Sequence, residues 1–201
     1  MQGEMIELYH ATLKENALSM TNSQEFICNE KKADNEFLGR GAYFYNIRQN
    51  AVDWTIKMYK DVHRGKLPQN AIAIIDKYRI VNADIEVKNS NILDLDNRIN
   101  IKKMNDFANL VSEKLGMNIT SDNYKPLAVL LNYMERENYL EGIDIVQKDF
   151  GFPTNLNKNL DKLKFINKKV ICVKNNNIIK KMKIAKKINQ KEFEDSMYFM
   201  K

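Results

Sequence analysis

Gly39-Arg40-Gly41-Ala42-Tyr43-Phe44-Tyr45 is the stretch around which the fold of this chain is organised. Its glycines allow the backbone a tight approach, and its aromatic run is typical of a β-strand. Upstream, the apolar-rich residues 5–9 predict a first strand that leads into Tyr9-His10-Ala11-Thr12. Downstream, apolar side chains at three- to four-residue spacing predict an amphipathic helix over residues 50–63, which carries Trp54. We therefore expect a strand, a glycine turn, a second strand and a helix in this order.

The remaining sequence predicts further helices and strands, and so an α+β fold. Pro126 suits the first turn of a helix over residues 125–137, and Gly116 marks the end of a helix over residues 101–115. No internal repeat or Ser/Gly linker interrupts the chain, so one domain over residues 1–201 is expected. A short helix is expected at residues 13–20, and strands at 71–75, 78–85, 92–95, 142–146, 170–173 and 182–188.

The composition favours a globular protein. Of the 201 residues, 44% are hydrophobic and 29% are charged, which is enough apolar surface to offset chain entropy. No apolar run reaches the roughly 18 to 20 residues that span a bilayer, and the N-terminal residues lack the layout of a secretion signal, so a cytoplasmic location is expected. Cys28 and Cys172 lie far apart without a CxxC pattern or a flanking histidine, which indicates neither a metal site nor a disulfide.

The net charge of +6 is unevenly distributed. The segment from Lys158 to Lys191 holds twelve lysines and one acid, Asp161, which gives it a charge of +11 and leaves the rest near −5. Such a segment is typical of a surface that binds nucleic acid or an acidic partner, because clustered cations release counterions from a polyanion. The alternative is compositional drift in a chain that is rich in Lys, Asn and Ile throughout.

Three segments, taken in order, resemble a known family. They are Tyr9-His10-Ala11-Thr12, the Gly-x-Gly-x-Tyr-Phe pattern that ends at Phe44, and Trp54, which follows Tyr43 by eleven residues. Together they are similar to the His-Tyr-Glu branch of the ADP-ribosyltransferases, which includes the poly(ADP-ribose) polymerases, diphtheria toxin and small bacterial domains. The likeness spans about residues 6–188. It implies a single ADP-ribosyltransferase-like domain with split antiparallel sheets around an NAD cleft and with flanking helices.

The resemblance also implies roles for individual residues, with NAD as the substrate. His10 and Tyr43 are the catalytic pair that it indicates, and His10 is expected to bind a hydroxyl of the adenosine ribose. Tyr43 and Trp54 are expected to stack on the nicotinamide ring, whose positive charge favours aromatic faces. The alternative is that both aromatics are ordinary core residues. His63, at a helix end, is expected to be structural.

Four neighbours of the catalytic pair complete the expected NAD site. The backbone N–H and C=O of Ala11, which stands where the family has Gly, are expected to hold the carboxamide. Thr12 is expected to brace its own backbone or the nearby phosphate. Gly41 belongs to the turn that allows close approach, and Arg40 is expected to meet the diphosphate, because a guanidinium matches phosphate oxygens bidentately.

The family's third residue, a Glu at the start of the penultimate strand, has no counterpart in this alignment. Lys169 or Val170 occupies its place, and neither is an acid. In the family, an apolar residue there implies transfer of one ADP-ribose unit rather than a polymer, or loss of activity. Glu141, Asp144 and Asp149 lie one strand earlier and are open alternatives for a carboxylate in the cleft.

Two classes of function remain from the sequence. The first is a mono-ADP-ribosyltransferase that modifies a protein or nucleic acid, in the manner of a bacterial toxin or defence effector. The second is a degenerate domain that binds NAD, ADP-ribose or nucleic acid without chemistry. Removal of an RNA 2′-phosphate, which uses NAD on a similar fold, is a related enzymatic alternative that requires further basic residues.

Overall fold

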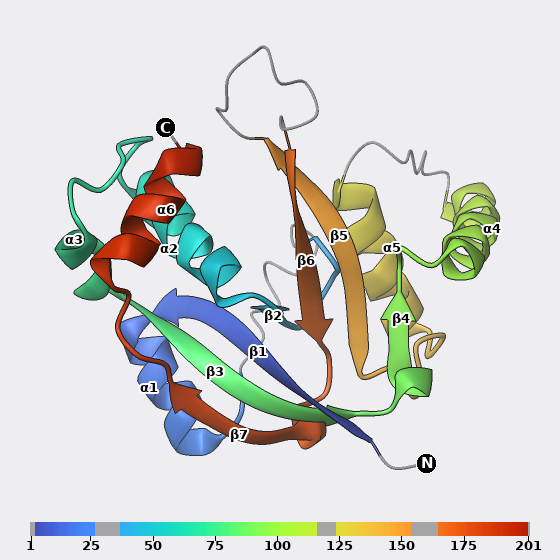
Figure 1. The fold of residues 1–201 in the computed structure, drawn as a ribbon. Helices are drawn as coiled ribbons and strands as arrows, with labels where there is room; N and C mark the ends of the chain where they lie inside the picture. The colour runs from blue at the N-terminus through green and yellow to red at the C-terminus, as the bar shows by residue number, and fades with distance from the viewer. Residues whose placement is uncertain (1–2, 27–36, 116–123, 154–164, 201) are drawn as a thin grey trace.

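The computed structural model describes residues 3–26, 37–115, 124–153 and 165–200, and it shows an α+β fold (Figure 1). The strands are β1 (Glu4–Leu13), β2 (Ala42–Tyr45), β3 (Tyr78–Val87), β4 (Ile92–Asp94), β5 (Ile145–Pro153), β6 (Phe165–Val173) and β7 (Ile179–Ile184). The helices are α1 (Lys14–Ser23), α2 (Arg48–Val62), α3 (Ala71–Ile75), α4 (Arg98–Leu115), α5 (Tyr124–Arg136) and α6 (Gln190–Met200).

The described strands form one sheet of seven, in the order β4-β5-β6-β2-β1-β3-β7. Neighbouring strands are antiparallel except for β4 and β5, which are parallel. The sheet is therefore mixed, and the expectation of purely antiparallel sheets is wrong at the β4 edge. The physical reason is the connection, since α4 and α5 lie between β4 and β5, and a long helical crossover lets the second strand run parallel to the first.

The sheet divides into two halves between β1 and β2. Strand β1 pairs with β3 at ten positions, from Glu4↔Val87 to Leu13↔Tyr78, but it pairs with β2 at one, Tyr9↔Tyr45. Figure 1 shows β1, β3 and β7 sweeping across the lower part of the molecule, while β6, β5 and β4 stand upright beside them. We call β1, β3 and β7 the first half-sheet, and β2, β6, β5 and β4 the second half-sheet.

Helices pack on both faces of the sheet, and α1 packs on the first half-sheet. Alternate residues of β2 point to opposite faces of the sheet, because side chains of a strand alternate in direction. The α2 face also carries α5 and α6, and its core includes Ala11, Tyr45, Ile56, Leu131, Cys172 and Phe193. The α1 face has a second core, which includes Leu8, Ala17, Phe44, Val81, Ile171 and Met182.

Most of the elements expected from periodicity are present, with two corrections. Residues 71–75 were expected to be a strand but form helix α3, because the side chain of Asn70 accepts a hydrogen bond from the backbone N–H of Ala73 and so caps a helical turn. A five-residue apolar run has no periodicity that separates the two structures. The last strand is Ile179–Ile184 rather than residues 182–188, and Gly116 and Cys28 lie outside the described residues.

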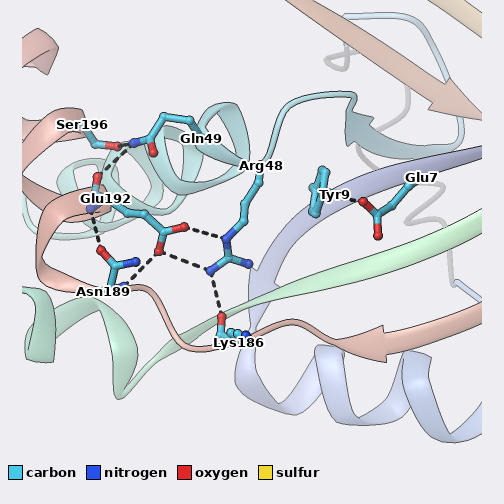
Figure 2. Close-up of polar contacts among 8 residues, drawn as sticks. All are labelled: Glu7, Tyr9, Arg48, Gln49, Lys186, Asn189, Glu192 and Ser196. Atoms are coloured by element: carbon cyan, nitrogen blue, oxygen red, sulfur yellow. Dashed lines mark hydrogen bonds and ion pairs between the residues drawn. The ribbon is translucent and has the colours of Figure 1, made fainter.

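Helix α6 was not expected from the sequence. Asn189 and Glu192 begin it with reciprocal bonds: the Glu192 N–H donates to Asn189 Oδ1, and the Asn189 N–H donates to Glu192 Oε2, both at 2.9 Å. This capping box, Asn-x-x-Glu, is the signal in the sequence that would have located the helix. Figure 2 shows how Arg48, at the start of α2, joins this cap through Glu192 and through the Lys186 carbonyl.

Candidate functional site

The backbone N–H and C=O groups of β1 that face β3 are paired along the whole strand. Residues along a strand direct their N–H and C=O groups alternately to the two sides. The Lys14 N–H donates to the Lys77 carbonyl, so the even-numbered residues of β1 face β3. Ile80 of β3 lies opposite Ala11, and its carbonyl accepts from the N–H of Ala185, on the side away from β1. This bond agrees with the same alternation, in which Ala11 and Ile80 do not bond to each other. The N–H and C=O of Ala11 therefore point away from β3, toward β2.

Strand β2 does not pair with β1 at Ala11. In a continuous sheet, the register of the Tyr9↔Tyr45 pair would place Ala11 opposite Tyr43. The strands separate before that point, and the Nδ1 atom of His10 lies 2.6 Å from the Tyr43 carbonyl oxygen. Among the described residues, Ala11 has no strand partner on this side. The N–H and C=O of Ala11 therefore face the split between the half-sheets, with His10 and Tyr43 beside them.

The hydrogen-bond partner of His10 determines where its proton lies. A carbonyl oxygen only accepts, so Nδ1 carries the hydrogen and Nε2 is the acceptor of the neutral ring. Burial lowers the pKa of His10 and outweighs the opposing effect of the bond to Tyr43. The half-buried ring also packs against Phe44 at a centroid distance of 5.3 Å. His10 is therefore neutral at pH 7 and offers Nε2 as an acceptor.

Tyr43 is anchored by its own turn. Its hydroxyl donates to the Gly39 carbonyl at 2.5 Å and accepts from the Leu38 N–H at 2.9 Å. Its ring packs on the α2 face, whereas the His10 ring packs with Phe44 on the α1 face. The structure thus brings the two expected catalytic residues together at the split, where they meet through the Tyr43 backbone and direct their rings to opposite faces.

The glycines of the turn are required by close packing against the protein itself. Gly41 has φ +152°, and a Cβ there would lie 2.3 Å from Cys172 Sγ and 2.7 Å from the Val173 carbonyl oxygen. Gly39 has φ +73°, and a Cβ there would lie 2.6 Å from Asn132 Oδ1. The tight approach expected from the sequence is confirmed, and the described atoms that come close belong to β6 and α5.

Arg40 lies between these glycines, and its side chain is exposed. Its N–H donates to Asn132 Oδ1 at 2.7 Å, and its carbonyl accepts a hydrogen bond from Lys174 Nζ. Lys174 also lies 3.2 Å from a Glu135 carboxylate oxygen. The Arg40 backbone is thereby held to both α5 and the end of β6, with the Lys174 ammonium at the Arg40 carbonyl.

Trp54 lies on α2, on the same face of the sheet as Tyr43. Its ring packs near Phe37 and Tyr45, at centroid distances of 6.3 and 6.5 Å, and Lys57 Nζ lies 4.3 Å from its centroid. An aromatic face that attracts a lysine ammonium is also suited to a pyridinium cation. Trp54 therefore packs against the core, and its ring is partly exposed beside Lys57.

Thr12 belongs to the α1 side of the site. It is buried, and its Oγ1 accepts from Asn16 Nδ2 at 3.4 Å. Its backbone is paired to β3 opposite Arg79. Thr12 thus ties the end of β1 to both α1 and β3, and its expected role at an NAD site stays a prediction.

The alignment position of the missing Glu holds a buried apolar side chain. Val170 is 1% exposed and sits opposite Tyr45 in β2. Lys169 points to the other face, where its Nζ lies 3.8 Å from Asp149 and 3.9 Å from Asp96. Asp149 is therefore directed away from Tyr43 and Trp54.

The other two acidic alternatives are also placed away from the split. Asp144 accepts hydrogen bonds from Asn91 and Asn175, each at 2.8 Å. Glu141 is exposed in the turn before β5. Among these three carboxylates, none is brought to the α2 face beside Tyr43.

A buried carboxylate does lie on the α2 face, and the sequence did not indicate it. Asp53, on α2, forms an ion pair with Lys168 of β6, and its second oxygen accepts from Ser196 Oγ of α6 at 2.5 Å. Gln49 donates to the same hydroxyl at 2.6 Å (Figure 2). This cluster joins three elements that are far apart in the sequence, so no local motif announces it.

The lysine-rich segment does not form a uniform basic face. Lys168, Lys169, Lys174 and Lys180 each have a carboxylate within ion-pair distance among the described residues. Lys181 and Lys183 are exposed on the edge strand β7, and such lysines protect an open strand edge from pairing with other chains. Lys158, Lys162 and Lys164 lie outside the described residues. A smaller basic surface over β7 and the start of α6 is what the structure retains.

His63 has the structural placement that was expected. Its Nδ1 lies 2.8 Å from the Tyr59 carbonyl oxygen, and its ring stacks on Tyr59 at a centroid distance of 3.8 Å. Within the described ranges, no group of three or more His, Cys, Asp or Glu residues is arranged to hold a metal ion. In the same ranges, no helix is long and apolar enough to cross a membrane.

Comparison with known proteins identifies a relative without a stated function. No family model matches the chain, and no solved structure matches it. The chain is similar to an uncharacterized protein of Methanocaldococcus jannaschii, with 28% identity over 193 residues. The match covers 87% of this chain and 85% of the relative, so the two chains are alike along nearly their whole length.

Proposed function

We propose that this chain is an NAD-dependent mono-ADP-ribosyltransferase whose NAD cleft lies at the split between β1 and β2. The observation that carries the proposal is the backbone of Ala11, which directs one donor and one acceptor into the split. A carboxamide presents one acceptor oxygen and an NH₂ donor group side by side, so it is the complementary ligand. The nicotinamide of NAD carries such a carboxamide.

The side chains around Ala11 suit the rest of NAD. Tyr43 and Trp54 lie on one face of the sheet and supply aromatic surfaces for the nicotinamide ring. His10 offers Nε2 as an acceptor for a ribose hydroxyl. The exposed Arg40 guanidinium, with Lys174 beside its backbone, suits the diphosphate. These four residues come from β1, the glycine turn, β2 and α2, in the order of the resemblance.

The reaction proposed is transfer of one ADP-ribose unit. The bond between C1′ of the ribose and the nicotinamide nitrogen breaks, and nicotinamide leaves as a neutral molecule with the bonding electron pair. The acceptor nucleophile then forms a bond to C1′ and loses its proton to solvent or to a base. Residues around the cleft act by orienting NAD and by placing dipoles and charge near the oxocarbenium-like state.

Val170 makes slow, single transfer the expected outcome. A carboxylate in its place would polarise the ribose 2′-hydroxyl, and the loss of one such electrostatic partner costs about 2.7–4 kcal/mol, or roughly 10² to 10³ in rate. Chain growth requires a ribose hydroxyl to act as the nucleophile, and neither Val170 nor Lys169 can serve as its general base at neutral pH. Monomeric ADP-ribose adducts without polymer are therefore expected.

Isothermal titration calorimetry with NAD, followed by incubation with labelled NAD and a mixed protein and nucleic-acid lysate, tests the proposal. Binding that weakens in a Tyr43→Ala, Trp54→Ala double variant and discrete single adducts on a gel support it. Equal NAD affinity in the wild type and the double variant would contradict the site, and a polymer ladder would contradict mono-transfer.

A second candidate function is an NAD- or ADP-ribose-binding domain without turnover. The observation that favours it is the burial of Val170 together with the pairing of Asp53 to Lys168, so that neither position supplies an unpaired carboxylate to the nicotinamide ribose. Under this alternative, NAD binds in the same calorimetric experiment but no label is transferred. Hydrolysis of NAD to free nicotinamide, followed by chromatography, separates the two candidates even when the acceptor is unknown.

A further inference from the structure

A second group of polar side chains crosses the first half-sheet on the α2 face. Tyr9, Asn82 and Lys183 are consecutive neighbours in register across β1, β3 and β7. Residues paired in this way project from the same face of a sheet. Glu7 lies two residues from Tyr9 on β1, so its side chain projects from that face as well. The group therefore presents a phenol, an amide, an ammonium and a carboxylate on one surface.

Asn82 brings a buried acceptor that has no donor. Its side chain is 4% exposed, and Oδ1 has no hydrogen-bond partner within the described part of the chain. The Asn82 side chain lowers the pKa of Glu7, as an amide N–H facing a carboxylate does. Turning the amide over would place its oxygen against that carboxylate, so the orientation with Oδ1 unpartnered is the favourable one. A buried acceptor without a donor is destabilising. A ligand hydroxyl or N–H that donates to Asn82 Oδ1 removes this cost, so binding there is favoured.

Glu7 supplies the second acceptor. The Tyr9 hydroxyl donates to one of its oxygens at 2.5 Å, and this bond is the largest of the effects that lower the pKa of Glu7. The carboxyl is therefore ionised at neutral pH, and its side chain is exposed, so the remaining lone pairs can accept from a ligand. An exposed acceptor, the Glu7 carboxylate, thus lies beside a buried one, Asn82 Oδ1.

Two cations lie near the Tyr9–Glu7 pair. The exposed Lys183 ammonium and the Arg48 guanidinium lie close enough to act electrostatically on Glu7 and Tyr9, respectively. Figure 2 shows Arg48 beside the Tyr9–Glu7 pair, with its other side held by Glu192. These cations disfavour a positively charged ligand. A ligand that carries two hydroxyl groups and a nearby anion fits better, because the hydroxyls can donate to the acceptors and the anion can face a cation.

We propose that Glu7, Asn82 and Lys183 form a ribonucleotide site, in which a ribose 2′,3′-diol donates to Glu7 and to Asn82 Oδ1 and the adjoining phosphate lies at Lys183. A carboxylate that accepts from a ribose hydroxyl is a recurrent means of nucleotide recognition. The site goes beyond the NAD-cleavage proposal, because it uses residues other than Ala11, Tyr43 and Trp54 and requires no chemistry at the split.

Titration of the protein with AMP, adenosine and 2′,3′-dideoxy-AMP by calorimetry tests the site. AMP is expected to bind, and loss of both ribose hydroxyls should weaken binding roughly three- to tenfold for each hydrogen bond removed. Glu7→Gln should weaken AMP by a similar factor. Glu4→Gln is the matched control, because Glu4 is exposed on the same strand, projects from the other face and undergoes the same change of charge. Lys183→Gln should weaken AMP but leave adenosine unchanged.

The proposal is overturned if AMP does not bind, if dideoxy-AMP binds as tightly as AMP, or if Glu7→Gln and Glu4→Gln have the same affinity. A competition with NAD distinguishes the two sources of this ribose. AMP that NAD displaces would identify the adenosine half of NAD as the natural occupant, and AMP that binds the NAD-saturated protein would identify a separate nucleotide. Trp54→Ala keeps the proposals apart, because it should weaken NAD at the split and leave AMP unchanged.

Discussion

The two edges of β1 are built from the same ten residues but have opposite roles. The edge toward β3 is paired at every position from Glu4 to Leu13, and the edge toward β2 is paired only at Tyr9. A paired edge satisfies its backbone groups internally, so it adds stability and is closed to ligands. An edge whose neighbour departs leaves donors and acceptors that another molecule can use. The comparison teaches that a binding site can be made in a sheet by ending a pairing rather than by adding a side chain.

Such a split needs a clamp, because the two half-sheets are joined through one residue pair. Asp53 on α2 and Lys168 on β6 form a buried ion pair, which Ser196 of α6 completes. Because α2 also packs on β1 and β3, this ion pair ties the helix that covers the first half-sheet to the second half-sheet. His10 adds a bond from β1 to the Tyr43 carbonyl. The closed edge of β1 has no need of such contacts. The following variants therefore act on the split, with controls placed elsewhere.

Breaking the buried clamp is expected to have the largest effect. Asp53→Ala removes the carboxylate from a buried lysine, and such a loss costs roughly 3–5 kcal/mol in the free energy of unfolding. Urea denaturation followed by circular dichroism measures it. Asp61→Ala, at an exposed position on the same helix, is the control and should change stability little. A drop of under 1 kcal/mol, roughly the value of a surface pair, would show that the half-sheets hold together without the clamp.

Gly41→Ala is expected to have the second largest effect on stability, because it disturbs the second half-sheet. The added methyl would meet the Val173 carbonyl oxygen at 2.7 Å, which is backbone and cannot rotate away, at a φ of +152° that side chains rarely adopt. Overpacking of this kind costs about 1–3 kcal/mol. Gly65→Ala is the control, because its φ is +85° and nothing lies within 4 Å of the new atom, so only backbone strain applies. Equal melting temperatures for the two variants would refute the close approach of Gly41 to β6.

His10→Ala should affect both stability and the proposed NAD site by a smaller amount. It removes the bond to the Tyr43 carbonyl, which is worth about 0.5–1.5 kcal/mol, and it removes the Nε2 acceptor, so the dissociation constant for NAD should rise several-fold. His63→Ala is a matched control, since His63 makes the same kind of bond, from Nδ1 to the Tyr59 carbonyl, away from the split. NAD affinity that falls equally in both variants would argue against a role for His10 in the site.

The pH dependence of stability should show the smallest effect. Burial lowers the pKa of His10 below its ordinary value of 6.5, so the unfolded chain takes up this proton before the folded chain does. Above this pH His10 is neutral in both states and does not affect the pH dependence. As the pH falls through about 6.5, protonation of the unfolded chain lowers the free energy of unfolding. His10→Gln keeps a donor toward Tyr43 and should flatten this part of the curve. Urea denaturation midpoints of the wild type and the variant at about pH 7.5 and 5.5 test this expectation. An equal change in midpoint between the two pH values for both proteins would contradict the lowered pKa of His10.

The sequence was informative wherever one segment carries the whole signal. The glycine turn, the aromatic strand after it and the amphipathic helix α2 all have local periodicity or composition that admits one structure, and their bounds agree with those expected to within a few residues. The apolar run at Ala71–Ile75 was ambiguous, because five residues contain too few repeats to separate helix from strand. Helix α6 has a capping box, Asn189 and Glu192, that marks its start in the sequence.

Pairings between distant segments could not be predicted in the same way. Asp53 meets Lys168 and Ser196 across more than a hundred residues, and nothing at any of the three positions indicates the other two. The lysine-rich segment shows the same effect, since the carboxylate partners of Lys168 and Lys174 come from α2 and α5, which are distant in the sequence. Charge counted along a sequence therefore overestimates the charge that remains on a surface.

The sequence by itself determined the local elements and the chemical identity of the residues at the split, because turn geometry, strand propensity and helical periodicity act over a few neighbours. Only the tertiary structure decided that β1 and β2 part after Tyr9 and that the Ala11 backbone faces the opening. It also decided that His10 and Tyr43 meet through a carbonyl rather than through their rings. The reason is that strand register, the phase of backbone hydrogen bonds and the face of each side chain are set jointly by all strands of the sheet.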